Sequence, residues 1–208
     1  MINIYQVVNG ALLENCYIVT KNSKECILID PGTEYEKVAK RLTELDLTPI
    51  AVLLTHGHYD HAGSVYLYHK NNIPIYIHNN DQEMLSSSIK SLAVMLGESI
   101  QKTQPDVILY GEEEFIIADI NIKTIHTPGH TSGSVCFIVD NQYMFSGDTI
   151  FYLSYGRYDL PSGSKKEIMN SIKNIIFSIK ENLQIFPGHY QLTTLDFERE
   201  NNPILRDN

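Results

Sequence analysis

The stretch THGHYDHAG, residues 55 to 63, places three histidines and one aspartate within six positions. It follows the apolar run PIAVLLT, which the pattern predicts as a strand. Side chains two residues apart on an extended segment leave the same face, so His56 and His58 can converge on one point. Asp60 and His61 follow across a tight bend and can point at a second spot close by. Neutral imidazole and carboxylate groups suit Zn²⁺, Mn²⁺ or Fe²⁺, and four of them in one loop indicate two metal ions.

Three further candidate ligands follow a glycine at the end of an apolar run: His130 in TIHTPGHTSGS, Asp148 in MFSGDTIF and His189 in IFPGHY. Taken singly, each could be an ordinary loop residue. Glycine permits close approach and turn geometries forbidden to other residues, so a ligand just past it is easily aimed into a cleft. The predicted assignment is His56, His58 and His130 on one metal, Asp60, His61 and His189 on the other, and Asp148 bridging the two. A water between such ions has its pKa lowered to about 7 and becomes a nucleophile.

The composition indicates an ordinary globular protein with one domain covering residues 1–208, since 43% of the residues are hydrophobic and 20% are charged. The net charge of −9 and the lack of a basic run argue against nucleic acid as a partner. We expect a cytoplasmic protein with no membrane partner, because the start MINIYQVVNG does not resemble a secretory signal and no apolar run approaches a membrane helix. Cys16, Cys26 and Cys136 are predicted to be core thiols.

Strand-like and helical patterns alternate along the chain in β-rich and helical blocks. Strand character is predicted for residues 2–8, 15–20, 26–30, 49–55, 72–78, 106–110, 114–126, 134–140, 142–148 and 183–189. Helices are predicted over residues 34–46, 62–69, 81–96, 164–180 and 193–200. Asp81 is the candidate N-terminal cap of the third helix. Two sheets packed face to face with helices outside satisfy this order.

The motifs LIDPG (28–32), THGHYDHAG, TPGHTSGS, SGDTIF and FPGH resemble, in order and over nearly the whole chain, those of the metallo-β-lactamase superfamily. The resemblance implies the α/β fold of that family, a four-layer αββα sandwich with the metals at one edge of the two sheets. Residues 146–164 and 186–203 are similar to short bacterial members of the glyoxalase II, or hydroxyacylglutathione hydrolase, group. The implied reaction is hydrolysis of a thioester such as S-lactoylglutathione. It would use two Zn²⁺, with Fe or Mn possible in either site, and a metal-bridging hydroxide.

Other residues have expected roles beside the ligands. Asp60 is the candidate catalytic residue, because it can orient the hydroxide as well as bind metal. Asp30 either accepts a hydrogen bond from a ligand imidazole or simply forms the turn before Pro-Gly. Arg157 matches a basic residue that contacts a glutathione carboxylate in longer relatives, or it forms a structural salt bridge. Tyr152 and Tyr155 either line the substrate cleft or pack in the core.

Three departures from the resemblance concern the substrate. We expect no C-terminal helical domain of the kind that supplies much of the glutathione site in full-length glyoxalase II. Tyr158 stands where short members usually have Thr, and Tyr190 stands where Gly is common. Asp148 makes β-lactamase activity less favoured, because lactamase-type members generally lack the bridging aspartate.

Three alternative activities share the fold implied by the resemblance. A persulfide dioxygenase would use a single iron, whereas the seven candidate ligands favour two metals. A nuclease is disfavoured because the chain shows neither a clamp domain nor a basic surface. A lactonase shares every ligand, and only the segments GRYDLPSG and TT…NP weigh against it.

Overall fold

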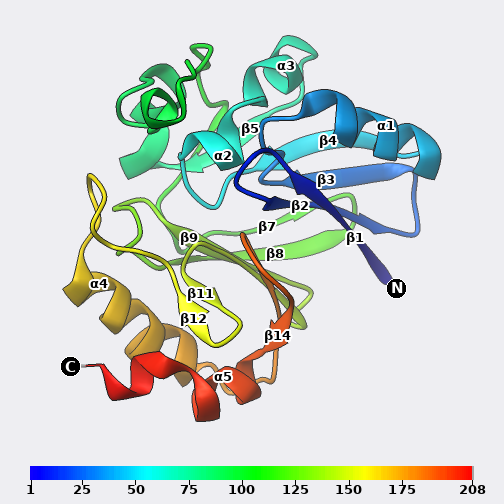
Figure 1. Ribbon diagram of the computed structural model, residues 1–208. Helices are drawn as coiled ribbons and strands as arrows, with labels where there is room; N and C mark the ends of the chain where they lie inside the picture. The colour runs from blue at the N-terminus through cyan, green and yellow to red at the C-terminus, as the bar shows by residue number, and fades with distance from the viewer. Residues whose placement is uncertain (208) are drawn as a thin grey trace.

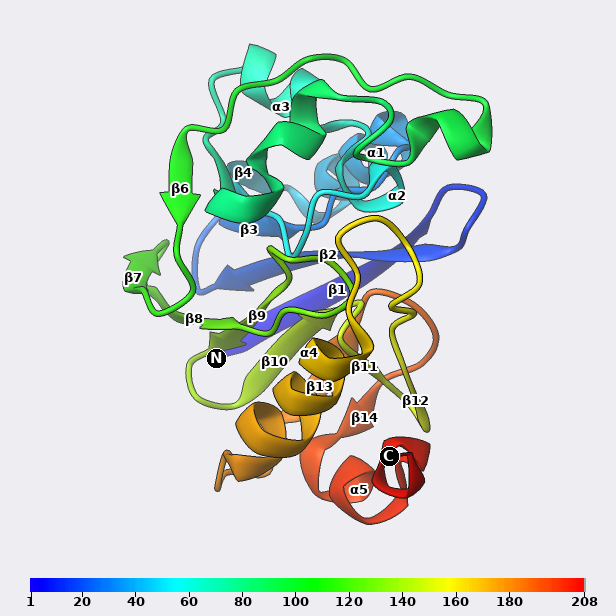
Figure 2. The ribbon, with the colours of Figure 1, turned by 90° about the vertical axis from the view of Figure 1, so that its left-hand side faces the viewer.

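The computed structural model describes residues 1–207 and contains two six-stranded sheets packed face to face between helices (Figures 1 and 2). The strands of the first sheet are, in spatial order, β1 (Ile2–Asn9), β2 (Glu14–Lys21), β3 (Glu25–Ile29), β4 (Thr48–Leu53), β5 (Ile75–His78) and β6 (Val107–Leu109). Those of the second are β14 (Thr193–Thr194), β13 (Gln184–Pro187), β10 (Tyr143–Gly147), β9 (Val135–Val139), β8 (Ile120–His126) and β7 (Glu114–Ile117). A small hairpin consists of β11 (Ile150–Phe151) and β12 (Ser154–Tyr155).

Helices cover the outer face of each sheet, so the expected four-layer αββα sandwich is confirmed. Those on the first sheet are α1 (Tyr35–Leu45), α2 (Tyr59–Ala62) and α3 (Val65–Lys70), with the 3₁₀ helices η1 (Asn79–Ser86) and η2 (Ala93–Leu96) beyond them. Those on the second sheet are α4 (Lys165–Asn170), which continues through a π turn η3 (Ser171–Ile175) and a 3₁₀ turn η4 (Ile176–Ser178), α5 (Leu195–Asn201) and the 3₁₀ turn η5 (Pro203–Arg206). Ser164 caps α4 by accepting a hydrogen bond from the Glu167 N–H.

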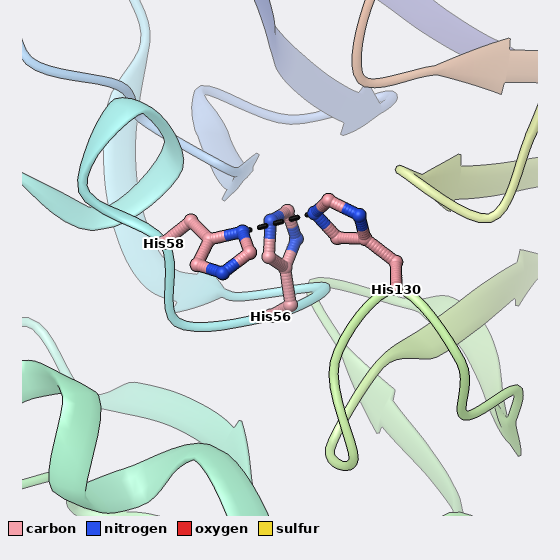
Figure 3. Close-up of side chains that lie close together, drawn as sticks. All are labelled: His56, His58 and His130. Carbon is pink, nitrogen blue, oxygen red and sulfur yellow. Dashed lines mark hydrogen bonds between the residues drawn. The ribbon is translucent and has the colours of Figure 1, made fainter. Parts of the chain in front are cut away.

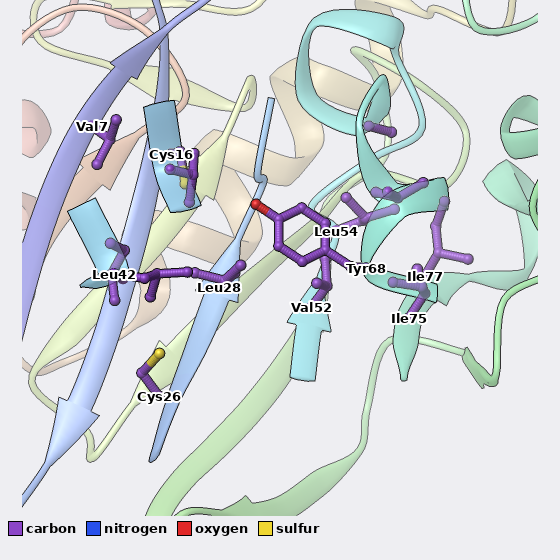
Figure 4. Close-up of a cluster of buried hydrophobic side chains, with 14 of the residues drawn as sticks. Val7, Cys16, Cys26, Leu28, Leu42, Val52, Leu54, Tyr68, Ile75 and Ile77 are labelled. Carbon is purple, nitrogen blue, oxygen red and sulfur yellow. The ribbon is translucent and has the colours of Figure 1, made fainter. Parts of the chain in front are cut away.

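The layers are held by apolar side chains on both faces of each sheet. Along β2, Tyr17 and Val19 belong to the cluster between the two sheets, whereas Cys16 and Ile18 belong to the cluster under the helices. This alternation follows from the two-residue period of a strand. Figure 4 shows the apolar cluster under the helices, in which Tyr68 of α3 lies among side chains of the first sheet. Burial on both faces explains why these strands read as continuous apolar runs.

Parallel pairing brings several strand ends to one edge of the sandwich. Strands β3 and β4 run parallel in the first sheet, and β10 and β13 run parallel in the second. The carboxyl ends of parallel neighbours lie at the same sheet edge. The residues that follow β3, β4, β10 and β13 therefore meet, and these are the segments that carry most of the predicted ligands.

The helix predicted over residues 81–96 is wrong. Only the short 3₁₀ helices η1 and η2 form there, and Leu92 between them has a left-handed φ of 65°. Serine side chains compete for the backbone in this stretch, since Ser87 accepts from the Lys90 N–H and Ser88 from the Ile100 N–H. Asp81 does not act as the N-terminal cap, because its carboxylate turns inward toward other loops.

The predicted strand region 114–126 is a hairpin rather than one strand. Ile117 pairs with Ile120, which leaves Ala118 and Asp119 as a two-residue loop. Both loop residues have positive φ, 50° and 60°, as a hairpin turn compatible with strand twist requires. Aspartate tolerates this conformation and alanine rarely adopts it, so the residue pattern concealed the turn.

Two further expectations concern cysteines and membranes. The three cysteines are buried free thiols, which confirms that prediction. Across residues 1–207, no helix has the length and apolar character needed to pass through a bilayer.

Removing an aromatic ring from between the sheets should lower the free energy of unfolding. The Phe145 ring lies 5.3 Å from that of Tyr17 and 5.1 Å from that of Phe186, measured between centroids. Phe145→Ala should cost about 3–5 kcal/mol in urea denaturation, because the cavity left behind cannot fully collapse. The control Tyr110→Ala removes a ring that is 68% exposed and should cost less than about 0.5 kcal/mol. Equal losses would contradict the contribution of the cluster between the two sheets to stability.

Candidate metal centre

The seven predicted ligands lie at the edge where the strand ends meet. His56 and His58 lie in the loop after β4, which leads into α2 with Asp60 and His61 in its single turn. The remaining three follow strands of the second sheet: His130 after β8, Asp148 after β10 and His189 after β13. The two sheets therefore each supply part of the set.

His56, His58 and His130 form a first cluster (Figure 3). One ring nitrogen from each lies within 4.8 Å of the others. The Nδ1 atom of His58 and the Nε2 atom of His130 are 2.9 Å apart, as the dashed line in Figure 3 marks. All three imidazoles are buried. The geometry brings together the three side chains that were predicted to share one metal.

Asp60, His61 and His189 form a second cluster of the same size, again with one ligand atom of each within 4.8 Å of the others. The Asp60 Oδ2 atom lies 3.4 Å from His189 Nε2 and 3.7 Å from His61 Nε2. His61 is fully buried, whereas Asp60 and His189 are partly open to solvent. These are the three side chains predicted for the other metal.

Asp148 lies between the two clusters. Its Oδ2 atom is 3.5 Å from His130 Nε2 in the first cluster and 3.6 Å from His189 Nε2 in the second. Its Oδ1 atom is 3.4 Å from His61 Nε2 and has no hydrogen-bond partner. One carboxylate therefore contacts both groups of histidines, which is the position a bridging ligand needs.

In three of the candidate histidines, His61, His130 and His56, the outer nitrogen has a partner that orients the ring. The Nδ1 of His61 lies 2.9 Å from the Asp30 carboxylate, and the Nδ1 of His130 lies 2.8 Å from the Arg157 carbonyl oxygen. Because these partners only accept, each Nδ1 donates its proton and each Nε2 carries a lone pair directed inward. Asp30 therefore contacts the imidazole of a candidate ligand, and its left-handed φ of 48° also fits the turn before Pro-Gly, so the structure agrees with both roles considered for it.

Asp30 also orients His56, through Thr55. The Thr55 hydroxyl donates to Asp30 Oδ2 over 2.6 Å and lies 3.1 Å from His56 Nδ1. A hydroxyl that donates to the carboxylate is free to accept from His56 Nδ1, which again leaves Nε2 with its lone pair inward. One buried aspartate thus aligns a histidine in each cluster.

The inner atoms fit divalent metal ions. His56 Nε2, His61 Nε2 and Asp148 Oδ1 are all buried without a hydrogen-bond partner. Buried polar atoms rarely remain unsatisfied, and each such atom costs about 1–3 kcal/mol. Lone-pair nitrogens and carboxylate oxygens directed at two common points match the ligands of zinc and related ions. The two clusters could each hold one ion, with Asp148 shared.

The pKa shifts differ between the two clusters. They leave neutral imidazoles in the first cluster and favour a positive charge in the second. Burial lowers the pKa of His56 well below its usual value and that of His58 to about 3, so both imidazoles are neutral. Burial also opposes charge on His61, but the carboxylates of Asp60, Asp148 and Asp30 outweigh it and raise the His61 pKa well above its usual value. The second cluster therefore attracts a proton in the place where a cation could bind.

A cavity of about 500 Å³ opens beside the two clusters, and Arg157 and Tyr155 are among the residues that line it. Arg157 forms a bidentate ion pair with Asp159, with both N···O distances 2.8 Å, as the salt-bridge alternative predicted. The Tyr155 hydroxyl donates to Asp207. Tyr152 is not among the lining residues, because its ring stacks on Phe197 with 5.4 Å between centroids.

Sequence reasoning missed the role of Asp81. Its buried carboxylate accepts from the N–H groups of Gly57 (3.1 Å) and Gly133 (2.9 Å) and from the Thr131 hydroxyl (2.7 Å). Gly57 separates His56 from His58, and Thr131 follows His130, so Asp81 ties together the two loops of the first cluster. Its position one turn past the end of β5, at the same edge as the ligands, could have indicated this role.

Glu14 was also missed. It is fully buried at the start of β2, neither of its carboxyl oxygens has a hydrogen-bond partner, and Oε1 lies 3.9 Å from His61 Nδ1. Burial raises the pKa of Glu14 well above its usual value, with the neighbouring carboxylates adding to the effect and His61 opposing it. Nothing in the sequence distinguished this residue from an exposed turn glutamate.

Residues 193–203 contain Thr193-Thr194, Glu198 and Asn202-Pro203, and this part of the segment similar to the glyoxalase II group has a structural role. The buried Glu198 carboxylate accepts from the Thr193 hydroxyl (2.6 Å), the Asn202 side-chain amide (2.7 Å) and the Leu153 N–H (3.1 Å). Asn202 also donates to the Ser154 carbonyl over 2.9 Å. These bonds hold the β11–β12 hairpin against α5, and the hairpin forms one wall of the cavity.

Replacing Asp81 should loosen the first cluster. Asp81→Ala leaves the buried N–H groups of Gly57 and Gly133 without an acceptor, while the Thr131 hydroxyl keeps Ser134 as a partner. We therefore expect the free energy of unfolding to fall by about 2–4 kcal/mol. The dissociation constant for zinc should rise about 10–100-fold, since outer partners position metal ligands. Urea denaturation and competition with a metallochromic chelator measure the two effects. Asp81→Asn keeps one acceptor oxygen, so its stability and its zinc affinity should lie between those of the wild type and Asp81→Ala. An Asp81→Ala protein with unchanged zinc affinity would contradict this role.

A family model described as the metallo-beta-lactamase superfamily matches residues 9–189 of the chain. The chain is 32% identical over 199 residues to the probable metallo-hydrolase YqgX of Bacillus subtilis (strain 168), covering 94% of each protein. It is 33% identical over 207 residues to the hydroxyacylglutathione hydrolase GloC of Haemophilus influenzae (strain ATCC 51907 / DSM 11121 / KW20 / Rd), covering 98% of each.

Solved structures agree with these matches. The crystal structure of BLEG-1 B3 metallo-beta-lactamase superposes with a TM-score of 0.92 at 33% identity, covering 98% of this chain and 99% of that one. The structure of TTHA1623 in a di-iron-bound form superposes with a TM-score of 0.83 at 35% identity, covering 96% and 98%. The family match and the full-length relatives show that this chain belongs to the metallo-β-lactamase superfamily.

Proposed function

We propose that the chain is a binuclear metal-dependent hydrolase that cleaves small thioesters in the manner of glyoxalase II. The observation that carries the proposal is the position of Asp148, whose carboxylate contacts histidines of both clusters. A bridging carboxylate suits two ions held close together, and paired ions are suited to hydrolysis. The proposed ligands are His56, His58 and His130 for one ion, Asp60, His61 and His189 for the other, and Asp148 for both.

Bound divalent ions would lower the pKa of a water molecule and polarise the carbonyl oxygen of the substrate. Asp60 lines the cavity beside Asp148, so its Oδ atoms can accept a hydrogen bond from the attacking water and hold that water in place. As the new C–O bond forms and the C–S bond breaks, one proton of the attacking water passes to the departing sulfur, so that the products are a carboxylic acid and a thiol. A thiolate leaves readily, so no protein nucleophile is required.

Two comparisons support parts of the proposal. GloC, at 33% identity, is described as a hydroxyacylglutathione hydrolase, which supports thioesters as the substrate class. Zinc is the metal we propose for both sites, and the di-iron-bound form described for TTHA1623 makes iron the first alternative. The proposed substrate is a small molecule, and the cytoplasmic location remains a prediction.

A second candidate function is β-lactam hydrolysis. The specific observation that favours it is the likeness to BLEG-1, a B3 metallo-beta-lactamase that superposes over nearly all of this chain. Metal-assisted attack on an amide carbonyl needs the same nucleophile but a poorer leaving group. We place it second because Asp148 contacts both clusters, and lactamase-type members generally lack that aspartate. Nitrocefin and S-lactoylglutathione assayed in parallel separate the two activities.

Removing the shared carboxylate should lower metal content and turnover together. Elemental analysis of the zinc-loaded protein should find two ions per chain, and Asp148→Ala should retain one or fewer. The kcat for thioester hydrolysis should fall by about 10²-fold or more, because water activation and metal retention both depend on this residue.

The matched control is Asp196→Ala, which removes a carboxylate that is 56% exposed and does not line the cavity. It should leave both metal content and kcat unchanged. An Asp148→Ala protein that keeps two ions and full turnover would show that the bridge assignment is wrong.

A further inference from the structure

The cavity has two chemically different parts. One end consists of candidate metal ligands: His58, Asp60, His130, Asp148 and His189. The rest of the wall combines apolar side chains with serine and tyrosine hydroxyls and one arginine, and it comes from chain segments that are distant in sequence. Its apolar part includes the β1–β2 turn with Leu12, the η2 segment with Leu92, Met95 and Leu96, β11 with Phe151, and Leu160.

Much of this apolar wall is exposed to water. Met95 is 66% exposed, Leu12 48% and Leu96 42%. Contiguous exposed apolar side chains on a soluble protein commonly mark a binding site. Here the exposed side chains continue directly into the cavity that contains the candidate ligands, so a molecule bound at the metals would cover them. Met95 adds a flexible side chain that adapts its shape to different ligands.

Positive charge is scarce on the same wall. Among the described residues that line the cavity, Arg157 is the one lysine or arginine, and it is held in a bidentate pair by Asp159. Glutathione carries two carboxylates, and proteins usually recognise such groups with charge-assisted hydrogen bonds from arginine or lysine. The lining offers one cation, already paired, for two carboxylates. The walls therefore match an uncharged ligand better than a charged tripeptide.

We infer that the natural substrate is a thioester with an uncharged hydrocarbon acyl chain, which packs on a wall formed by Leu12, Met95 and Leu96. This inference rests on the proposed function, because it requires the carbonyl group of the substrate to lie at the two clusters. The chain extends from that carbonyl toward the cavity mouth and removes the exposed apolar side chains from water. The thiol part makes no ion pair that binding requires.

Acyl-chain length tests the inference directly. The probes are acetyl and hexanoyl thioesters of N-acetylcysteamine, a small neutral thiol, assayed with the zinc-loaded protein beside S-lactoylglutathione. The hexanoyl thioester should have a kcat/KM at least about tenfold above that of the acetyl thioester, since methylenes gain contact with an apolar wall. It should also exceed that of S-lactoylglutathione. Equal values for the two chain lengths, or a preference for the glutathione thioester, would overturn the inference.

Variants locate the effect on the proposed wall. Leu12→Ser and Met95→Ser, from two separate segments, should each reduce the hexanoyl-to-acetyl ratio by about threefold or more. The matched control is Ile89→Ser, because Ile89 is 73% exposed and apolar but does not line the cavity. Ile89→Ser should keep the ratio and the activity on the acetyl thioester. If all three variants behave alike, the wall does not select the acyl chain.

Binding measurements separate this inference from the proposed function. The ligands are the matching ketones, in which CH₂ replaces the thioester sulfur and no hydrolysis can occur. Calorimetry should show tighter binding and a more negative heat-capacity change for the longer ketone. Chain-length-dependent binding without cleavage of any thioester would uphold the apolar wall and overturn the thioesterase. Cleavage of S-lactoylglutathione with no chain-length dependence in binding would uphold the thioesterase function and overturn the apolar wall as the acyl-chain site.

Discussion

Three carboxylates surround one buried histidine, His61, and their negative charge is the constraint on which the site depends. Asp30 is buried, and Asp60 and Asp148 are only partly open to solvent. Removing a carboxylate from water is costly unless positive charge or strong hydrogen bonds compensate. His61 touches all three and can carry only one positive charge. The three carboxylates raise the pKa of His61, which shows that positive charge is stabilised at this place. Two divalent cations would compensate the negative charge more fully than one proton does.

The sandwich meets this constraint by ending parallel strands side by side at one edge. Gly147 illustrates how closely the two sheets approach there. It has a φ of 47°, and a Cβ atom at this position would lie 2.2 Å from the Thr55 hydroxyl. Only glycine therefore lets the end of β10 reach the loop after β4 and direct Asp148 between the two clusters. The apolar clusters on both faces of each sheet hold these strand ends in register.

Much of the architecture could be predicted from the sequence, because each strand and each ligand loop carries a local pattern. The apolar runs indicated buried strands, and residues such as Asp148 followed them directly. What could not be predicted depends on contacts between distant segments. Asp81 was misinterpreted as a helix cap because its partners are 24 and 52 residues away. Glu14 became notable only once folding placed it, buried and unpaired, beside His61.

The most direct test of the central claim is the position of bound metal. Crystals grown with zinc and measured at the zinc absorption edge should give two anomalous peaks, one in each cluster, about 3.5–4 Å apart on either side of the Asp148 carboxylate. A single peak in one cluster, with full occupancy and active protein, would contradict the binuclear site. Peaks away from Asp148 would contradict its role as the shared ligand.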